Sequence, residues 1–324
     1  MKTEYRYNSS SQPFRSFLAI ASFCLLTLTV MAAPQAAPKT PTKPAAKTFD
    51  SPQQAAEALI AAAEKFDVAA LEAIFGPEGR DLVLTGEEAL DKRRAAEFAA
   101  LARRRNSVSV DPKHPNLATL LVGEDDWPLP VLIVKKGGNW SFDAETGRRE
   151  ILYRRVGDNE LNAINICRGF VEAQHEYALV KRDGSGVNQY AQRIISTPGK
   201  QDGLAWRNPD GTWGGPVGEG IARMIEQGYT SRSEPFHGYF FKVLKGQGPA
   251  APLGELDFVV KGVMIGGFAL VAAPAEYSVT GVKTFMVSHD GVVFEKDLGP
   301  QTLDAFKSME RFNPDKTWDP VMGK

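Results

Sequence analysis

The stretch SPQQAAEALIAAAEKFDVAALEAIF, residues 51–75, decides how the N-terminal half of the chain is interpreted. Its first four residues, Ser51–Gln54, combine an N-cap, a proline at the first helical position and a glutamine that completes a capping box. Apolar residues then recur every three or four positions as far as Phe66. Asp67 begins a second apolar repeat, which Gly76 and Pro77 end. The sequence therefore predicts two consecutive helices.

Strand signals follow these helices after a third, charged helix predicted over residues 87–104. Short β-prone runs occupy residues 106–110, 117–122, 131–134 and 140–143, and glycine or proline separates most of them. Helices that precede a small antiparallel sheet are typical of the α+β class. We therefore expect an α+β domain over residues 49–150.

A resemblance adds to this interpretation. The helical stretch 51–75, followed by LIVKKGGNWSFD at residues 132–143, resembles the nuclear-transport-factor-two-like domains. That resemblance implies a cone in which a curved antiparallel sheet wraps onto the helices. Such domains serve as enzymes and as binding modules, so the fold implies no chemistry.

The N-terminus has the pattern of a secretory signal. Arg15 precedes an apolar run at residues 17–32, and small residues before Ala33 suit cleavage after Ala32. We expect residues 1–32 to be removed and residues 33–48, rich in proline, alanine and lysine, to form a flexible spacer. An uncleaved anchor is the alternative, although the run is short for a membrane span. A periplasmic or secreted location follows.

Charge and cysteine content narrow the possible partners. The chain has 38 basic and 39 acidic residues, a balance that argues against nucleic acid or an anionic membrane as the main partner. Removal of the signal would also remove Cys24 and leave Cys167 as the single cysteine. Because Cys167 lies in an apolar helical pattern, we expect a buried, unreactive thiol.

The C-terminal half, residues 151–324, is predicted to be a second α+β domain. A long amphipathic helix runs to about residue 180, with an apolar face at Leu161, Ile164, Cys167, Phe170, Val171, Tyr177 and Ala178. Strand-like segments follow at residues 239–244, 257–260, 268–272, 284–287 and 292–296, and a short helix at residues 303–309. Asp290-Gly291 predicts a two-residue hairpin between the last two strands.

Four segments carry a more specific resemblance. The blocks GPEGRDLVLTG (76–86), LVGEDDWPLP (121–130), DNELNAINICRGFVEAQHEYA (158–178) and FHGYFF…EKDLG (236–299) resemble an uncharacterised bacterial envelope family, domain of unknown function 2950. This resemblance implies no established activity. The helix at 158–178 with PAEYSVTGVKTFMVSHDGVV (274–293) also resembles the heads of type IV pilins and pseudopilins. That likeness implies a long helix packed on an antiparallel sheet.

Two groups of residues are candidates for binding. Asp125 and Asp126 stand before Trp127, where they suit a cation or a basic partner, or else form a charged turn. A loop-rich stretch concentrates aromatic and polar groups, which suit sugars, peptides or a protein partner. Its members are Trp206, Trp213, His237 and Tyr239.

Motifs for catalysis, metal ions and cofactors are not recognised in the sequence. His175-Glu176 lacks the second histidine of H-E-x-x-H, and no serine lies in G-x-S-x-G. We therefore expect a non-enzymatic binding or assembly module near pilus, secretion or surface machinery, with no cofactor. The alternative is a hydrolase of envelope polymers that uses a cleft between the two domains. Its acid–base groups would come from Asp125, Asp126, Glu276 or His289.

Overall fold

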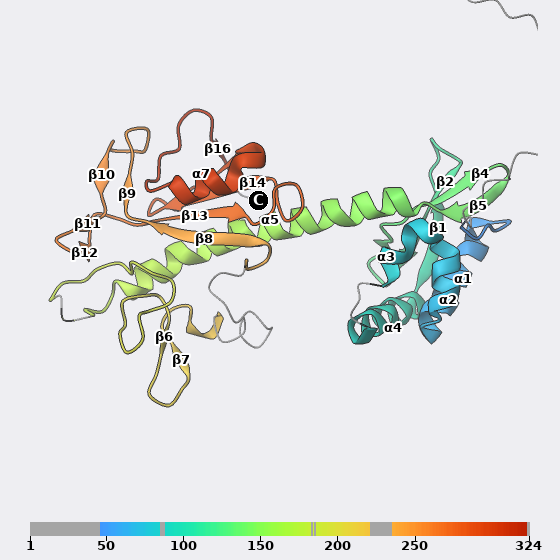
Figure 1. Ribbon diagram of the computed structural model, residues 1–324, viewed down its shortest axis with the longest axis horizontal. Coiled ribbons are helices and arrows are strands. Elements are labelled where there is room, and N and C mark those ends of the chain that lie inside the picture. The colour runs from blue at the N-terminus through green and yellow to red at the C-terminus, as the bar shows by residue number, and fades with distance from the viewer. Residues whose placement is uncertain (1–45, 85–87, 183, 185, 221–234, 323–324) are drawn as a thin grey trace, which may run out of the picture. The chain divides into compact units, whose positions relative to one another are not determined.

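The computed structural model describes residues 46–84, 88–182, 184, 186–220 and 235–322. The predicted signal peptide at 1–32 and nearly all of the spacer at 33–48 lie outside these residues. The chain is a mixed α+β structure with antiparallel sheets (Figure 1). Two sets of buried apolar residues form separate cores, one within residues 49–144 and the other within residues 163–318.

The first two helices begin at the N-cap residues that the sequence predicted. Helix α1 (Pro52–Lys65) is capped by Ser51, whose hydroxyl accepts a hydrogen bond from the Gln54 amide at 3.2 Å. Asp67 caps α2 (Val68–Phe75) in the same way, through the Ala70 amide at 3.0 Å. The 3-10 helix η1 (Pro77–Gly79), α3 (Arg80–Val83) and α4 (Glu88–Arg104) complete the helical layer.

The first sheet follows α4 and is antiparallel throughout. Its strands are β1 (Asn106–Val110), β2 (Leu117–Val122), β3 (Trp127–Pro128), β4 (Ile133–Lys136) and β5 (Asn139–Phe142). The order is β1-β2-β4-β5, and β3 pairs with β2. Alternate residues of β2 are buried, which places one face of the sheet on the helices that precede it. Predicted bounds for β1 and β2 are confirmed.

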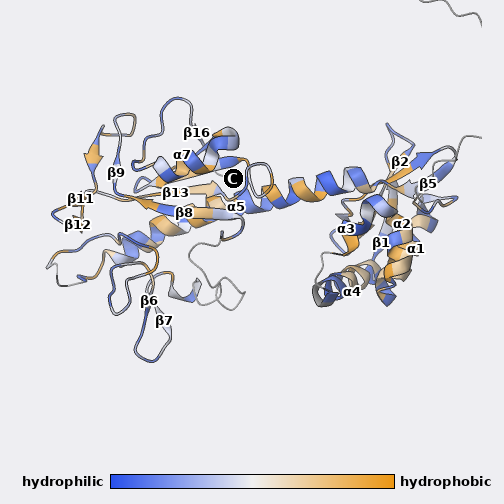
Figure 2. Ribbon diagram, in the orientation of Figure 1, coloured by the Kyte–Doolittle hydropathy of each residue, from blue (hydrophilic) through white to orange (hydrophobic). Residues whose placement is uncertain are grey.

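Helix α5 (Ala144–Tyr177) is a single 34-residue element. The boundary predicted between residues 150 and 151 falls inside this helix. Hydrophobic and hydrophilic residues alternate along it (Figure 2). The predicted apolar face is buried at Ile164, Cys167, Phe170, Val171 and Tyr177, whereas Leu161 is 56% exposed. Among the predicted positions, burial therefore begins at Ile164, three residues or nearly one helical turn after Leu161.

The second sheet has the strand order β16-β15-β14-β13-β8 and is also antiparallel. Its strands are β8 (Tyr239–Leu244), β13 (Ala269–Pro274), β14 (Lys283–Ser288), β15 (Val293–Asp297) and β16 (Asp319–Pro320). The 3-10 helix η2 (Gly299–Gln301) leads into α7 (Thr302–Ser308). All six residues of β13 are buried, because α5 and α7 both pack against this strand.

Three two-stranded hairpins complete the C-terminal half. They pair β6 (Trp206–Arg207) with β7 (Trp213–Gly214), β9 (Gly246–Gln247) with β10 (Leu256–Asp257), and β11 (Val259–Val260) with β12 (Val263–Met264). The segment predicted as one strand at 257–260 is thus divided between two hairpins.

The turn between β14 and β15 differs from the two-residue hairpin that Asp290-Gly291 predicted. Four residues, His289–Val292, separate the strands, and Val287 pairs with Val293. The Gly291 amide bonds the Ser288 carbonyl at 2.9 Å, and the Asp290 amide reaches the Ser288 hydroxyl at 3.4 Å. Ser288 thereby organises a wider turn, so the prediction was wrong in length.

Candidate functional site

The acidic pair Asp125 and Asp126 lies in the turn between β2 and β3. Asp126 adopts a left-handed φ of 49° and forms an ion pair with Arg105, Oδ2 to Nη2, at 3.2 Å. Trp127 is 45% exposed, and the guanidinium of Arg154 lies 5.2 Å from the centre of its ring. The two aspartates therefore lie in a charged turn, and Trp127 beside them lies on the surface.

The aromatic residues of the C-terminal half occupy different environments. Trp206 and Trp213 belong to the β6–β7 hairpin, where Arg182 stacks on Trp206 at 4.7 Å and Arg207 on Trp213 at 4.9 Å. His237 has a φ of 46° and packs on Phe236, with 4.2 Å between the ring centres. His237 and Trp127 also both line a hollow of about 770 Å³ along α5.

Tyr239 is buried in the core of the second sheet. Its side chain is 0% exposed, and its hydroxyl donates to the Lys283 carbonyl at 2.9 Å. Burial, with the nearby Glu160, raises the pKa of this phenol well above its ordinary value. Tyr239 therefore presents no surface to a ligand, unlike the other aromatic candidates.

Two of the groups considered for acid–base chemistry, His289 and Glu276, lie in turns of the second sheet. His289 faces Asp290, Nε2 to Oδ1, at 3.5 Å, and Glu276 lies in the loop after β13, where its carbonyl accepts from the Thr280 hydroxyl at 3.2 Å. Cys167 is fully buried, as predicted, and this burial raises the pKa of its thiol to about 12. No group of three or more His, Cys, Asp or Glu side chains in the described ranges could hold a metal ion.

A different set of residues forms a pocket of about 350 Å³ at the C-terminal end of α5. We call it the basic pocket, and it is lined by Tyr177, by the segment at residues 189–202 and by the β11–β12 turn. Three cations, Arg193, Lys200 and Lys261, face a single carboxylate, Asp202. The volume lies within the usual range for small-molecule sites.

Paired amides hold the wall of the basic pocket in place. The side chain of Gln174 on α5 exchanges two hydrogen bonds of 2.8 Å with the backbone of Ala191. The Tyr190 amide donates to the Met264 carbonyl at 2.8 Å, and Gln192 donates from Nε2 to the Gly262 carbonyl at 2.7 Å. These bonds attach the segment both to α5 and to the β11–β12 hairpin, so the packing of the chain shapes the pocket.

The carboxylate of Asp202 already has partners within the basic pocket. It accepts from the amide and the hydroxyl of Thr197 at 2.7 and 2.8 Å, and its Oδ2 lies 3.4 Å from Nε of Arg193. Burial opposes ionisation, but the Thr197 bonds and Arg193 together hold the pKa of Asp202 below its ordinary value. The carboxylate stays charged at neutral pH, and the pocket keeps a net positive charge from Lys200 and Lys261.

Sequence reasoning did not select these residues. They lie at positions 177, 193, 202 and 261, on segments that only the folded chain brings together. The aromatic signal at residues 206–213 pointed to the neighbourhood, because Arg182 stacks on both Trp206 and the pocket residue Tyr177. No single sequence motif includes the residues that line the pocket.

Comparisons with known proteins place the chain by sequence family. No curated protein and no solved structure matches it. Within the described residues, no helix is long and apolar enough to cross a membrane. The model of one family, described as "Protein of unknown function (DUF2950)", matches residues 46–321. The chain belongs to this family of unknown function.

Proposed function

We propose that this protein is an exported, non-enzymatic binding module of the bacterial envelope, and that the basic pocket holds its ligand. The observation that carries the proposal is the positive charge of this pocket. Three cations line it, together with one carboxylate that Thr197 already binds. Export is supported by the signal-like pattern of residues 1–32.

The lining favours a small anion that also carries hydroxyl groups. Lys200 and Lys261 supply positive charge at the surface, and the buried Gln189, whose Nε2 donates to the Arg182 carbonyl at 3.4 Å, adds an amide to the lining. The half-buried ring of Tyr190 offers an apolar face beside them. An acidic sugar, with either a carboxylate or a phosphate, combines these features and is a common component of envelope polymers.

Calorimetric titration of the purified exported protein tests this assignment. The probes are glucuronate and glucose 6-phosphate, with glucose as the neutral match. We expect both anions to bind and glucose to bind at least about tenfold more weakly, with a loss of affinity at high salt. The ratio of the two anions' affinities distinguishes a site that prefers carboxylate from one that prefers phosphate.

Substitutions link binding to the pocket. Lys200→Ala and Lys261→Ala should each weaken anion binding several-fold, and the double variant more. Lys245→Ala removes an exposed lysine outside the lining and should leave affinity unchanged. Equal binding of glucose and the anions, or an unaffected double variant, would reject the basic pocket as the ligand site.

We also propose that each half of the chain adopts the fold that it resembles in sequence. A nuclear-transport-factor-two-like cone over residues 49–150 and a pilin-like head over residues 151–324 would suit assembly near pilus, secretion or surface machinery. The support for both is the sequence likeness and the α+β order of elements. Cross-linking in cells, followed by mass spectrometry, tests this placement, and recovery of self-links alone would count against it.

A further inference from the structure

Leu253 combines two properties that a folded chain ordinarily avoids. It lies in the turn Ala251–Gly254, closed by a hydrogen bond of 3.0 Å from the Gly254 amide to the Ala251 carbonyl. Leu253 has a φ of 70° at the third position of this turn, where glycine or asparagine is favoured. Its side chain is also 92% exposed.

Packing within the chain does not account for this residue. A side chain that is 92% exposed gains little from its neighbours, while its β carbon strains the left-handed backbone. A polar residue or glycine would remove one or both costs. A strained backbone conformation persists only where the surrounding structure maintains it. Such residues cluster at sites that bind ligands or partners.

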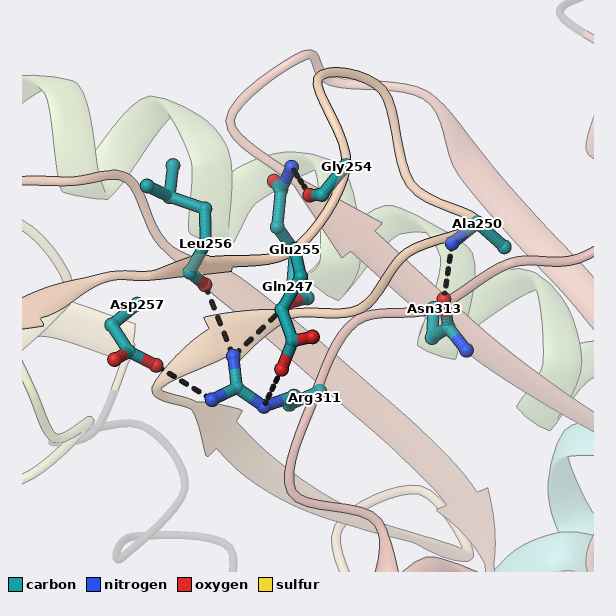
Figure 3. Close-up of polar contacts among 8 residues, drawn as sticks. All are labelled: Gln247, Ala250, Gly254, Glu255, Leu256, Asp257, Arg311 and Asn313. Carbon is teal, nitrogen blue, oxygen red and sulfur yellow. Dashed lines mark hydrogen bonds and ion pairs between the residues drawn. The ribbon is translucent and has the colours of Figure 1, made fainter.

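Side-chain hydrogen bonds connect the turn to the residues beneath it (Figure 3). The buried side chain of Gln247 donates from Nε2 to the carbonyls of Pro252 and Gly254, on either side of Leu253. Nη1 of Arg311 in turn donates to the Gln247 carbonyl at 3.1 Å. The turn is therefore held from beneath, at the residues on either side of Leu253.

A second attachment fixes the stem of this loop. Arg311 also donates to the Leu256 carbonyl at 3.2 Å and to Asp257 Oδ1 at 2.6 Å, and Asn313 accepts from the Ala250 amide at 2.8 Å (Figure 3). These bonds join β9 and β10 to the segment after α7. Because these bonds restrain the loop, docking would cost little further conformational entropy.

Charge near the turn indicates the kind of partner. Glu255 and Asp257 are 63% and 69% exposed, and both carboxylates share the single guanidinium of Arg311. A net negative charge beside one leucine opposes binding to anionic lipid, and one aliphatic side chain is a weak membrane anchor. We propose that Leu253 is the apolar anchor by which this turn docks into an apolar, basic-rimmed pocket of another protein.

Photo-cross-linking in cells tests the proposal, with a diazirine analogue of leucine at position 253. The same analogue at position 292 is the control, because Val292 is an exposed aliphatic residue on the β14–β15 turn. We expect an adduct with a distinct protein from position 253 only. The captured protein is then purified, and its affinity is measured for the full exported chain and its variants.

The variants separate docking from folding. Leu253→Gly relieves the backbone strain, so its Tm should be equal or higher, yet affinity should fall about tenfold or more. Glu255→Lys should also weaken binding, whereas Val292→Gly should not. Undiminished binding by Leu253→Gly overturns the proposal, as do adducts shared by both positions or formed only with lipid or a second copy. This test is independent of the basic pocket, whose anion titration reports on a different site.

Discussion

Thr284 carries a buried hydroxyl in β14. Its side chain is 0% exposed, and its Oγ1 has no hydrogen-bond partner in the described structure. An unpartnered buried hydroxyl opposes folding, and valine has the same shape without it. We expect Thr284→Val to raise the free energy of unfolding by about 1 kcal/mol in urea titrations.

Thr302 is the matched control, and its substitution should change the free energy of unfolding in the opposite direction. Thr302 is also buried, but its hydroxyl donates to the Gly299 carbonyl at 2.6 Å. Thr302→Val should therefore lower the free energy of unfolding by about 1 kcal/mol. If both variants were destabilised alike, the hydroxyl of Thr284 would have a partner, and our account of its environment would be wrong.

At the scale of the element, Glu160 attaches α5 to the chain that enters β14. One carboxylate oxygen, Oε1, accepts from the amides of Val282 and Lys283 at 2.8 and 3.0 Å. Glu160→Gln keeps the shape and removes the charge that strengthens both bonds, so we expect a loss of about 1 kcal/mol in urea unfolding. Glu172→Gln, on the exposed side of the same helix, should change little.

Arg311 tests whether the β9–β10 loop depends on its long-range attachment. Arg311→Met keeps the aliphatic stem but removes the bonds to Gln247, Leu256 and Asp257. Hydrogen exchange of amides in residues 250–257 should accelerate about tenfold or more, because local opening becomes easier. Arg168→Met, an exposed change on α5, is the control. Unchanged exchange in this loop would show that the remaining bonds, among them those of Gln247 and Asn313, are sufficient to order it.

Local signals explain which elements were predictable. Ser51 and Asp67 cap their helices through bonds that span three residues, so sequence alone located both helix starts. Longer connections left no such signal. Leu161 is exposed although its spacing matches the buried face, and Arg311 joins segments 54 residues apart. Spacing within a helix cannot report either fact.

At the scale of the whole molecule, the family was predictable and the candidate site was not. The blocks at residues 76–86 and 158–178 identify the family because they are continuous in sequence. The basic pocket instead depends on Lys261 in a turn approaching Tyr177 at a helix end. A fold brings such residues together through tertiary packing, which leaves no periodic pattern in the chain.

Thiol counting tests the exported form of the molecule. Cys167 is 0% exposed with a pKa of about 12, so at pH 8 it is both shielded and protonated. A thiol reagent should label no site in the native exported protein and one site after unfolding in guanidinium, as intact-mass measurement would record. Cleavage after Ala32 would remove Cys24, whereas an uncleaved chain would add a second label. Two labels would reject the cleaved signal peptide, and rapid native labelling of Cys167 would instead reject its burial, so the two inferences are tested separately.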